Sequence, residues 1–115
     1  MTEKRTINIA APMIGDAEKA AVMEVLDSGM LVQGAKVAEF EELFADYHNS
    51  RNAIATSNGT TALTTALLAV GVQPGDEVII PSFTFAATAT SVLSARATPV
   101  FVDVDRDTLL ASPEA

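Results

Sequence analysis

Residues 57–63, Ser-Asn-Gly-Thr-Thr-Ala-Leu, combine the residue types best suited to binding chemistry in this chain. They follow a short apolar segment, 53–56, and lead into a helix-forming run. The first N–H groups of a helix lack intrahelical acceptors and bear a partial positive charge, so they can bind phosphate. Gly59 permits close approach because it has no Cβ, and Thr60 adds a hydroxyl. The same residue types also form an ordinary helix cap, so the local sequence leaves both interpretations open.

Composition excludes several classes of protein. The 115 residues are 49% apolar, which is enough for one packed domain. The net charge of −8, from 15 acidic and 7 basic residues, disfavours nucleic acid or an anionic membrane as a partner. Cysteine is absent and His48 is the single histidine, so disulfides and Cys/His zinc sites are excluded. No signal peptide or membrane-spanning run is visible, and a cytoplasmic location is expected.

Helix and strand patterns alternate along the chain. We expect an irregular lead and two helices over residues 1–50, and a βαβαβ portion over 51–115. This order predicts an α/β fold in which helices cover a mainly parallel sheet. Ligands bind at the carboxyl ends of such strands, so 57–61 and 82–85 are expected to line one crevice. The expected helices are 16–28, one through 37–47, 60–70 and 83–95, and the expected strands are 53–56, 77–80 and 98–105.

Six ordered blocks closely resemble the amino-terminal part of the DegT/DnrJ/EryC1/StrS aminotransferases. The resemblance implies the large domain of a PLP-dependent transferase of fold type I, similar to aspartate aminotransferase. It also implies pyridoxal 5′-phosphate (PLP) as the cofactor and, for most members, nucleotide-linked keto-sugars as substrates. The blocks are 27–29 with 33–34, 39–41, 57–63, 75–79, 81–85 and 97–103, in the family's order and spacing.

The resemblance also implies roles for four residues. It places the PLP phosphate against Gly59, Thr60 and Thr61, and lays the Phe85 ring flat on the cofactor. Both assignments agree with physical chemistry, because a phosphate dianion needs oriented donors and an electron-poor pyridinium stacks on an aromatic face. A core position is the alternative for Phe85.

Other polar and aromatic residues receive simpler interpretations. Asp103 and Asp105 have the spacing of a metal pair or an acid/base dyad, but a strand-ending Asp-x-Asp is typical of a turn. We therefore expect no metal site. Phe83 is expected in the core, and His48 is expected to be a solvated residue at a helix end.

No catalytic residue is identifiable. Transamination requires a lysine that binds PLP covalently and moves a proton, and an acid that keeps the pyridine nitrogen protonated. The only lysines are Lys4, Lys19 and Lys36, which precede the phosphate segment on the leading tail or on or beside exposed helix faces. The family's catalytic residues lie downstream of Ala115, so the chain alone is expected to be inactive.

The resemblance therefore implies the amino-terminal part of an aminotransferase that transfers an amino group, expected from glutamate, to a nucleotide-linked keto-sugar. It implies a homodimer, with the loop 29–34 near the neighbouring subunit's site. Three alternatives stay open. They are a PLP-dependent sugar dehydratase of the same family, a noncatalytic α/β module for a phosphorylated ligand, and a gene fragment without activity.

The family's sheet also implies a structural problem for residues 53–56. In that sheet the first strand is separated from the next two by strands that come later in the sequence. We expect the isolated chain to be marginally stable, to aggregate, or to rearrange so that its three strands pair together.

Overall fold

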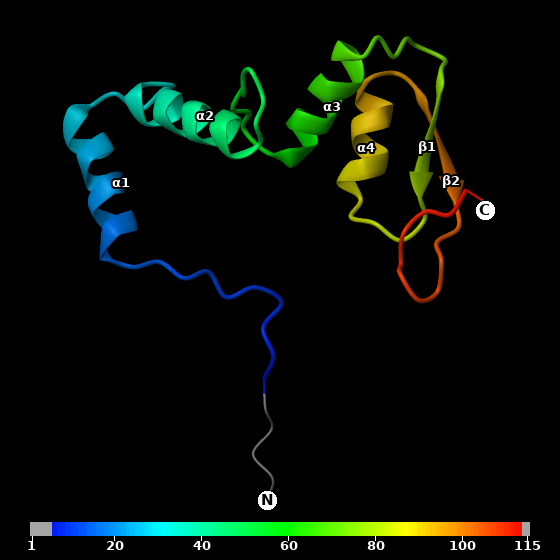
Figure 1. The fold of residues 1–115 in the computed structure, drawn as a ribbon, viewed down its shortest axis with the longest axis horizontal. Coiled ribbons are helices and arrows are strands. Elements are labelled where there is room, and N and C mark those ends of the chain that lie inside the picture. Colours follow the sequence, from blue (N-terminus) through cyan, green and yellow to red (C-terminus); the bar gives the residue numbers. More distant parts are fainter. Residues whose placement is uncertain (1–5, 114–115) are drawn as a thin grey trace, which may run out of the picture. The chain divides into compact units, whose positions relative to one another are not determined.

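The computed structural model describes residues 6–113 and divides the chain into two compact units (Figure 1). The described part of the first unit is 6–53, and that of the second is 54–113. No helix among the described residues has both the length and the apolar character needed to cross a membrane.

The first unit consists of a lead without regular secondary structure and two helices, α1 (Asp16–Ser28) and α2 (Ala35–Tyr47). At the start of α1, the Gly15 N–H donates to Glu18 Oε2 at 2.7 Å. The helix ends at Gly29, whose φ of 68° is the left-handed conformation that glycine adopts without steric cost. His48 is exposed and follows the last residue of α2, as the sequence predicted.

Burial is slight in the first unit. Ala45 is its only buried residue among those described, and large apolar side chains on both helices are exposed. One polar contact joins the two helices, because Lys36 Nζ lies 3.1 Å from Glu24 Oε2. The same amine lies 3.7 Å from Glu39 Oε2 on its own helix.

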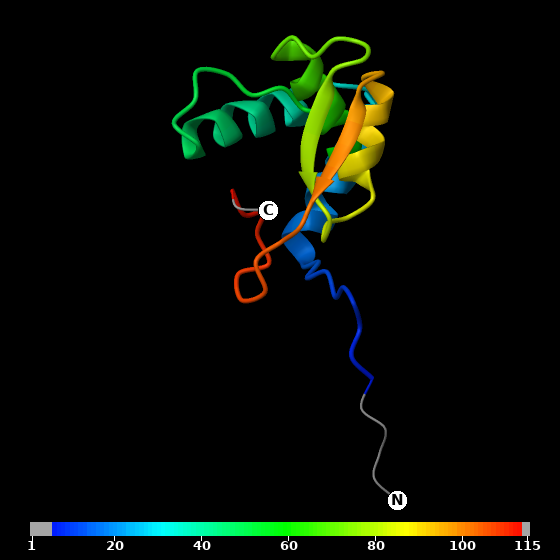
Figure 2. The same cartoon turned by 90° about the vertical axis from the view of Figure 1, so that its right-hand side faces the viewer.

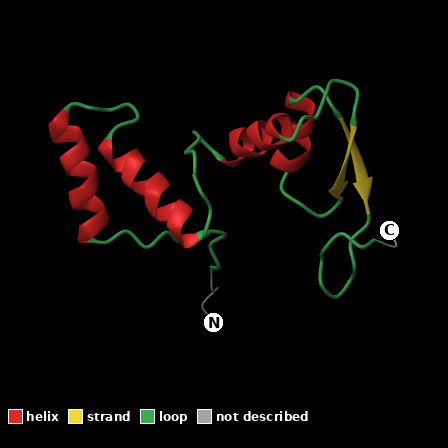
Figure 3. Cartoon of the chain, turned by 45° about the horizontal axis from the view of Figure 1, so that its top comes forward, coloured by secondary structure: helices red, strands yellow, loops and turns green. Residues whose placement is uncertain are grey.

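The second unit is a βαβ arrangement preceded by a helix. Its elements are α3 (Gly59–Ala69), β1 (Glu77–Pro81), α4 (Ala87–Ser94) and β2 (Thr98–Val102). The strands pair in parallel, with Ile79 opposite Val100. Figure 2 shows α4 against one face of the strands, and Figure 3 shows the two arrows side by side with the helices beyond them. The small parallel sheet with its covering helices confirms the expected α/β class.

The hydrophobic core lies between α4 and the strands. Ile80, Val92 and Ala97 are its buried centre. Four partly buried residues pack against them, Leu67, Val72, Val78 and Ala89. Since α3 contributes Leu67, both helices of the second unit are tied to the core that the strands provide.

Three expected elements differ from the structure by three residues or more. The segment 53–56 forms no strand, and Ile54 is 80% exposed. The rearrangement into three paired strands, one of the three expected alternatives, is therefore not found, because the described sheet contains β1 and β2 only. A segment this short is stable as a strand only when a neighbour supplies hydrogen bonds. The helix expected from residue 83 begins at Ala87, and the strand expected to reach 105 ends at Val102.

Candidate functional site

The start of α3 is capped by Asn58. Its Oδ1 accepts the Thr61 N–H at 2.9 Å and lies 3.1 Å from Thr61 Oγ1. Thr61 Oγ1 is also 3.3 Å from Ser57 Oγ. The cap interpretation is confirmed, and Asn58 uses only the third amide of the helix.

Gly59 and Thr60 are the first two residues of α3. A Cβ built at Gly59 would meet no heavy atom of the structure within 4 Å, so the space in front of its backbone is open. Thr60 is half-buried, and its carbonyl accepts the Thr64 hydroxyl at 3.0 Å. The cap therefore engages neither of the first two helix amides, those of Gly59 and Thr60.

Phe85 lies in the turn between β1 and α4 and is 81% exposed. Its carbonyl accepts the Thr88 N–H at 3.0 Å. A core position for Phe85 is thus not found in this chain. Phe83, which was expected in the core, is 67% exposed. That expectation is wrong because residues 82–85 form a bend outside the helix, where no neighbouring element covers the ring.

The two predicted parts of the site lie at the same end of the second unit. Helices α3 and α4 run side by side in the same direction, and both begin at the end of the unit toward which β1 runs (Figure 1). Thr64 Oγ1 lies 3.5 Å from the Ser91 carbonyl oxygen, which places the middle parts of the two helices next to each other. This end of the second unit therefore combines the N–H donors of a helix start with an exposed aromatic ring, the groups needed to hold a planar phosphorylated ligand.

The lysines of the described residues are engaged elsewhere. Lys19 Nζ lies 3.3 Å from Asp16 Oδ1 within α1. The Glu24 carboxylate, by its hydrogen bond and its charge, raises the pKa of Lys36, and the charge of Glu39 acts in the same direction. A raised pKa keeps the Lys36 amine protonated, which is unsuited to nucleophilic catalysis. Lys4 lies outside the described residues.

Asp105 organises a turn, as the sequence predicted. Its Oδ1 accepts the Thr108 N–H at 2.8 Å, the Thr108 hydroxyl at 3.0 Å and the Asp107 N–H at 3.1 Å. The bonds from Thr108, followed by that from Asp107, lower the pKa of Asp105. Asp103 Oδ1 accepts the Val104 N–H at 2.8 Å. Within residues 6–113, no three acidic or histidine side chains are grouped as metal ligands.

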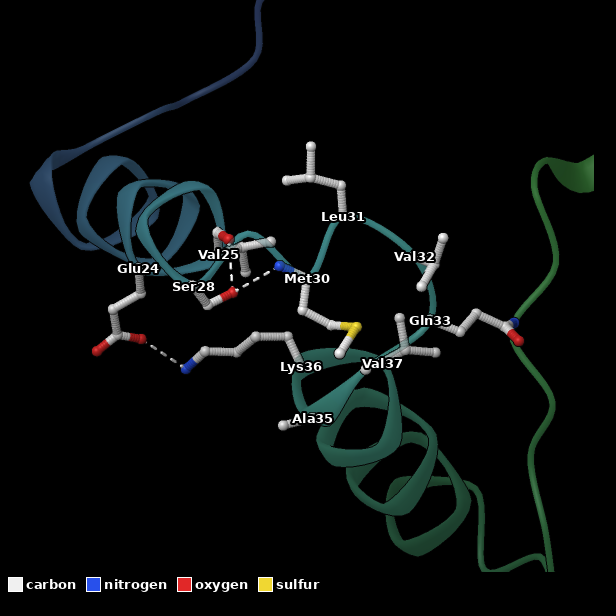
Figure 4. Close-up of a pocket in the computed structure, with 11 residues that line it drawn as sticks. Glu24, Val25, Ser28, Met30, Leu31, Val32, Gln33, Ala35, Lys36 and Val37 are labelled. Atoms are coloured by element: carbon white, nitrogen blue, oxygen red, sulfur yellow. Dashed lines mark hydrogen bonds and ion pairs between the residues drawn. The ribbon is translucent and has the colours of Figure 1, made fainter.

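A pocket of about 900 Å³ lies between α1 and α2, around the loop 30–34 (Figure 4). Met30, Leu31 and Val32 give it an apolar lining, and the ion pair of Glu24 with Lys36 lies at its side. The Met30 N–H donates to Ser28 Oγ at 3.1 Å. The sequence pattern predicted a loop here between the two helices, but only the family resemblance gave it a role, and the three apolar residues between Gly29 and Gly34 were the visible signal for a pocket.

The fold defines an α/β protein of the PLP-transferase type, and comparisons with known proteins identify the family. The chain belongs to the DegT/DnrJ/EryC1/StrS aminotransferase family, whose model matches residues 12–115. This match confirms the resemblance.

Individual relatives agree with that assignment. Over 106 residues the chain is 47% identical to GDP-perosamine synthase of Caulobacter vibrioides, a match that covers 91% of this chain and 29% of that protein. Over 115 residues it is 43% identical to the spore coat polysaccharide biosynthesis protein SpsC of Bacillus subtilis, with 98% and 30% covered. The PLP form of Spr1654 from Streptococcus pneumoniae superimposes with a TM-score of 0.85 at 33% identity, over 94% of this chain and 28% of that one. The chain thus spans about 30% of the length of these curated relatives.

Proposed function

We propose that this chain supplies the phosphate- and ring-binding part of a PLP-dependent sugar aminotransferase. In this proposal Gly59, Thr60 and Thr61 hold the cofactor phosphate, and Phe85 stacks on the cofactor ring. The observation that carries it is that the start of α3 and the segment 82–85 between β1 and α4 lie at one end of the second unit, and that Phe85 in this segment is exposed. The PLP form of Spr1654, which has the same fold over this region, supports the choice of cofactor.

The residues fit a phosphate dianion. The amides of Gly59 and Thr60 lie at the positive end of α3, and the cap engages neither. Hydrogen bonds to a charged group contribute about 1.5–3 kcal/mol each. Asn58 Oδ1 accepts both the amide and the hydroxyl of Thr61, so Thr61 donates to the phosphate only when Asn58 releases it. The phosphate is therefore held first by two backbone donors and by the Thr60 hydroxyl.

The chain's own residues bind and orient the cofactor rather than react with it. When bound, PLP supplies an electron sink for bond breaking next to an amine. Phe85 restricts the tilt of the planar ring by offering an apolar face. Lys19 and Lys36 receive no catalytic role because each is ion-paired and lies in the first unit. The reactive lysine and the acid are proposed to come from residues outside 1–115.

The proposed substrate is a nucleotide-linked keto-sugar, with glutamate as the amino donor. The identity of 47% with GDP-perosamine synthase supports this substrate class. A homodimer is proposed as the working form. These assignments concern the whole protein to which the 115 residues belong.

Retention of PLP by the whole protein tests the site. Gly59→Ala introduces a methyl group that meets no other atom of the chain, so the fold should be unchanged. Loss of PLP by this variant would then show that the methyl group obstructs the bound PLP. Thr60→Ala is expected to weaken PLP binding about tenfold or more through loss of one charge-assisted hydrogen bond. Phe85→Ala is expected to weaken it about two- to tenfold.

Matched controls come from the same segments. Phe83→Ala removes a second exposed ring two residues away, and Thr65→Ala removes a hydroxyl further along α3. Both controls should retain PLP like the unsubstituted protein. Equal retention by Gly59→Ala, Thr60→Ala and Phe85→Ala would contradict the proposed site.

A further inference from the structure

Phe85 lies in the sequence between Thr84 and Thr88, and the side chains of these two threonines contact each other. Thr84 Oγ1 and Thr88 Oγ1 lie 2.9 Å apart, a hydrogen bond between hydroxyl groups. We call this pair the threonine bridge. The Thr88 N–H also donates to the Phe85 carbonyl at 3.0 Å. The backbone of Phe85 is therefore tied at both sides to the first turn of α4.

These bonds matter because little else fixes the Phe85 ring. The ring is 81% exposed, and every aromatic contact found among the described residues lies in the first unit. The N-cap of α4 is Ala86, which provides no side-chain cap. The threonine bridge thus links the bend before α4 to the first turn of that helix through two side chains.

Threonine suits this role better than serine or valine. Its hydroxyl can both donate and accept, so one pair forms a single O–H···O bond without a charged group. Its branched Cβ also restricts χ1, which lowers the entropy lost when the bond forms. Two threonines four residues apart were visible in the sequence, but their contact depends on the bend that precedes α4.

We propose that Thr84 and Thr88 are positioning residues that hold Phe85 in the orientation required to stack on the cofactor ring. This inference rests on the proposed function, because it assigns the bridge a purpose at the same site. The bridge touches neither the helix start of α3 nor its cap. Its effect on PLP is therefore transmitted through Phe85.

The test uses the whole protein loaded with PLP and measures PLP affinity and the visible circular dichroism per bound PLP. Thr84→Val and Thr88→Val remove one hydroxyl each at nearly constant volume. Each is expected to weaken PLP binding about two- to tenfold, the factor of one neutral hydrogen bond, and to change the dichroism of the bound cofactor. Thr88→Ser keeps the hydroxyl and should restore the dichroism.

Thr90→Val is the matched control. Thr90 lies on the same helix, and its hydroxyl donates to the Ala87 carbonyl at 3.3 Å without reaching the Phe85 segment. It should leave affinity and dichroism unchanged. If the bridge only stabilises the start of α4, Thr84→Val and Thr88→Val will lower the melting temperature of the PLP-free protein and leave the dichroism per bound PLP unchanged. That result would overturn the inference.

Phe85→Ala separates this inference from the proposed function. If Phe85→Ala changes the dichroism and the bridge variants do not, the inference is wrong and the proposed site stands. If Phe85→Ala changes neither dichroism nor affinity, the proposed stacking is wrong, and the inference falls with it. The double variant Phe85→Ala/Thr88→Val should behave like Phe85→Ala, because both changes act through one ring.

Discussion

The two units of this chain bury apolar residues to different extents. In the second unit, Ile80, Val92 and Ala97 come together from β1, α4 and the start of the β2 segment, and they are buried. In the first unit, α2 also has a stripe of apolar side chains, yet Leu43 on that stripe is 63% exposed. A strand, a helix and a second strand enclose a core by themselves, whereas two helices without a further layer leave their apolar faces open.

Contacts in the first unit are correspondingly local. The rings of Phe40 and Phe44 lie 5.6 Å apart and those of Phe44 and His48 lie 4.3 Å apart, both one helical turn apart in sequence. Local contacts of this kind stabilise a helix by only a few tenths of a kcal/mol each. We therefore expect the loss of an apolar side chain to lower the free energy of unfolding more in the second unit than in the first.

The largest contrast is expected between Ile80→Ala and Leu43→Ala in the 115-residue chain. Removing the buried Ile80 side chain should cost about 2–5 kcal/mol, whereas the exposed Leu43 should cost less than about 0.5 kcal/mol. Hydrogen exchange measures both. The amides of Thr98 and Ser82, which donate across the strand pair at 2.8 and 2.9 Å, should exchange at least tenfold faster in Ile80→Ala. Strong destabilisation of α2 by Leu43→Ala would show that its apolar face is covered in solution.

A smaller effect is expected from the cap of α3. Asn58→Ala removes the acceptor of the Thr61 N–H and should destabilise the second unit by about 0.5–2 kcal/mol. Asn52→Ala, in the loop before that unit, is the control and should have little effect. Amide exchange in the first turns of α3 is the measurement. If the two variants exchange alike, the cap is unimportant for the fold.

Acid should loosen the turn at Asp105. The hydrogen bonds from Thr108 and Asp107 lower the pKa of Asp105. Its contribution to the stability of the turn is therefore complete above the pKa of the unfolded state, about 3.9, and is lost as the pH falls through the lower pKa of the folded state. The Thr108 amide resonance should follow that titration. In Asp105→Asn the response should disappear, and in Asp107→Asn it should persist. A response that persists without the Asp105 carboxylate would contradict this account.

The smallest effect is expected from Lys36, whose ion pairs are exposed. Its pKa is raised, so its contribution to stability is present below the unfolded value and is lost as the pH rises through the folded one. Lys36→Met should weaken the link between α1 and α2 at low salt and have no effect at high salt. Lys19→Met, which breaks a pair within α1, should leave that link unchanged. Amide exchange in α2 at two ionic strengths compares the variants.

The sequence alone determined the local elements. The acidic first turn and Gly29 gave the bounds of α1, and the spacing of apolar residues gave most of α2, because periodicity and helix ends depend on neighbours along the chain. The sequence also supplied the residue types of the site, Gly59, Thr60, Thr61 and Phe85, and the family to which the chain belongs.

Only the tertiary structure decided which of these segments and residues lie close together. The segment 53–56 stayed outside the sheet, and Phe83 outside the core, because both outcomes depend on partner surfaces that no local pattern encodes. The parallel course of α3 and α4 placed the start of α3 and the segment 82–85 at one end of the unit, and the bend before Ala87 brought Thr84 to Thr88. Residue type is a property of the sequence, whereas proximity requires a packed fold.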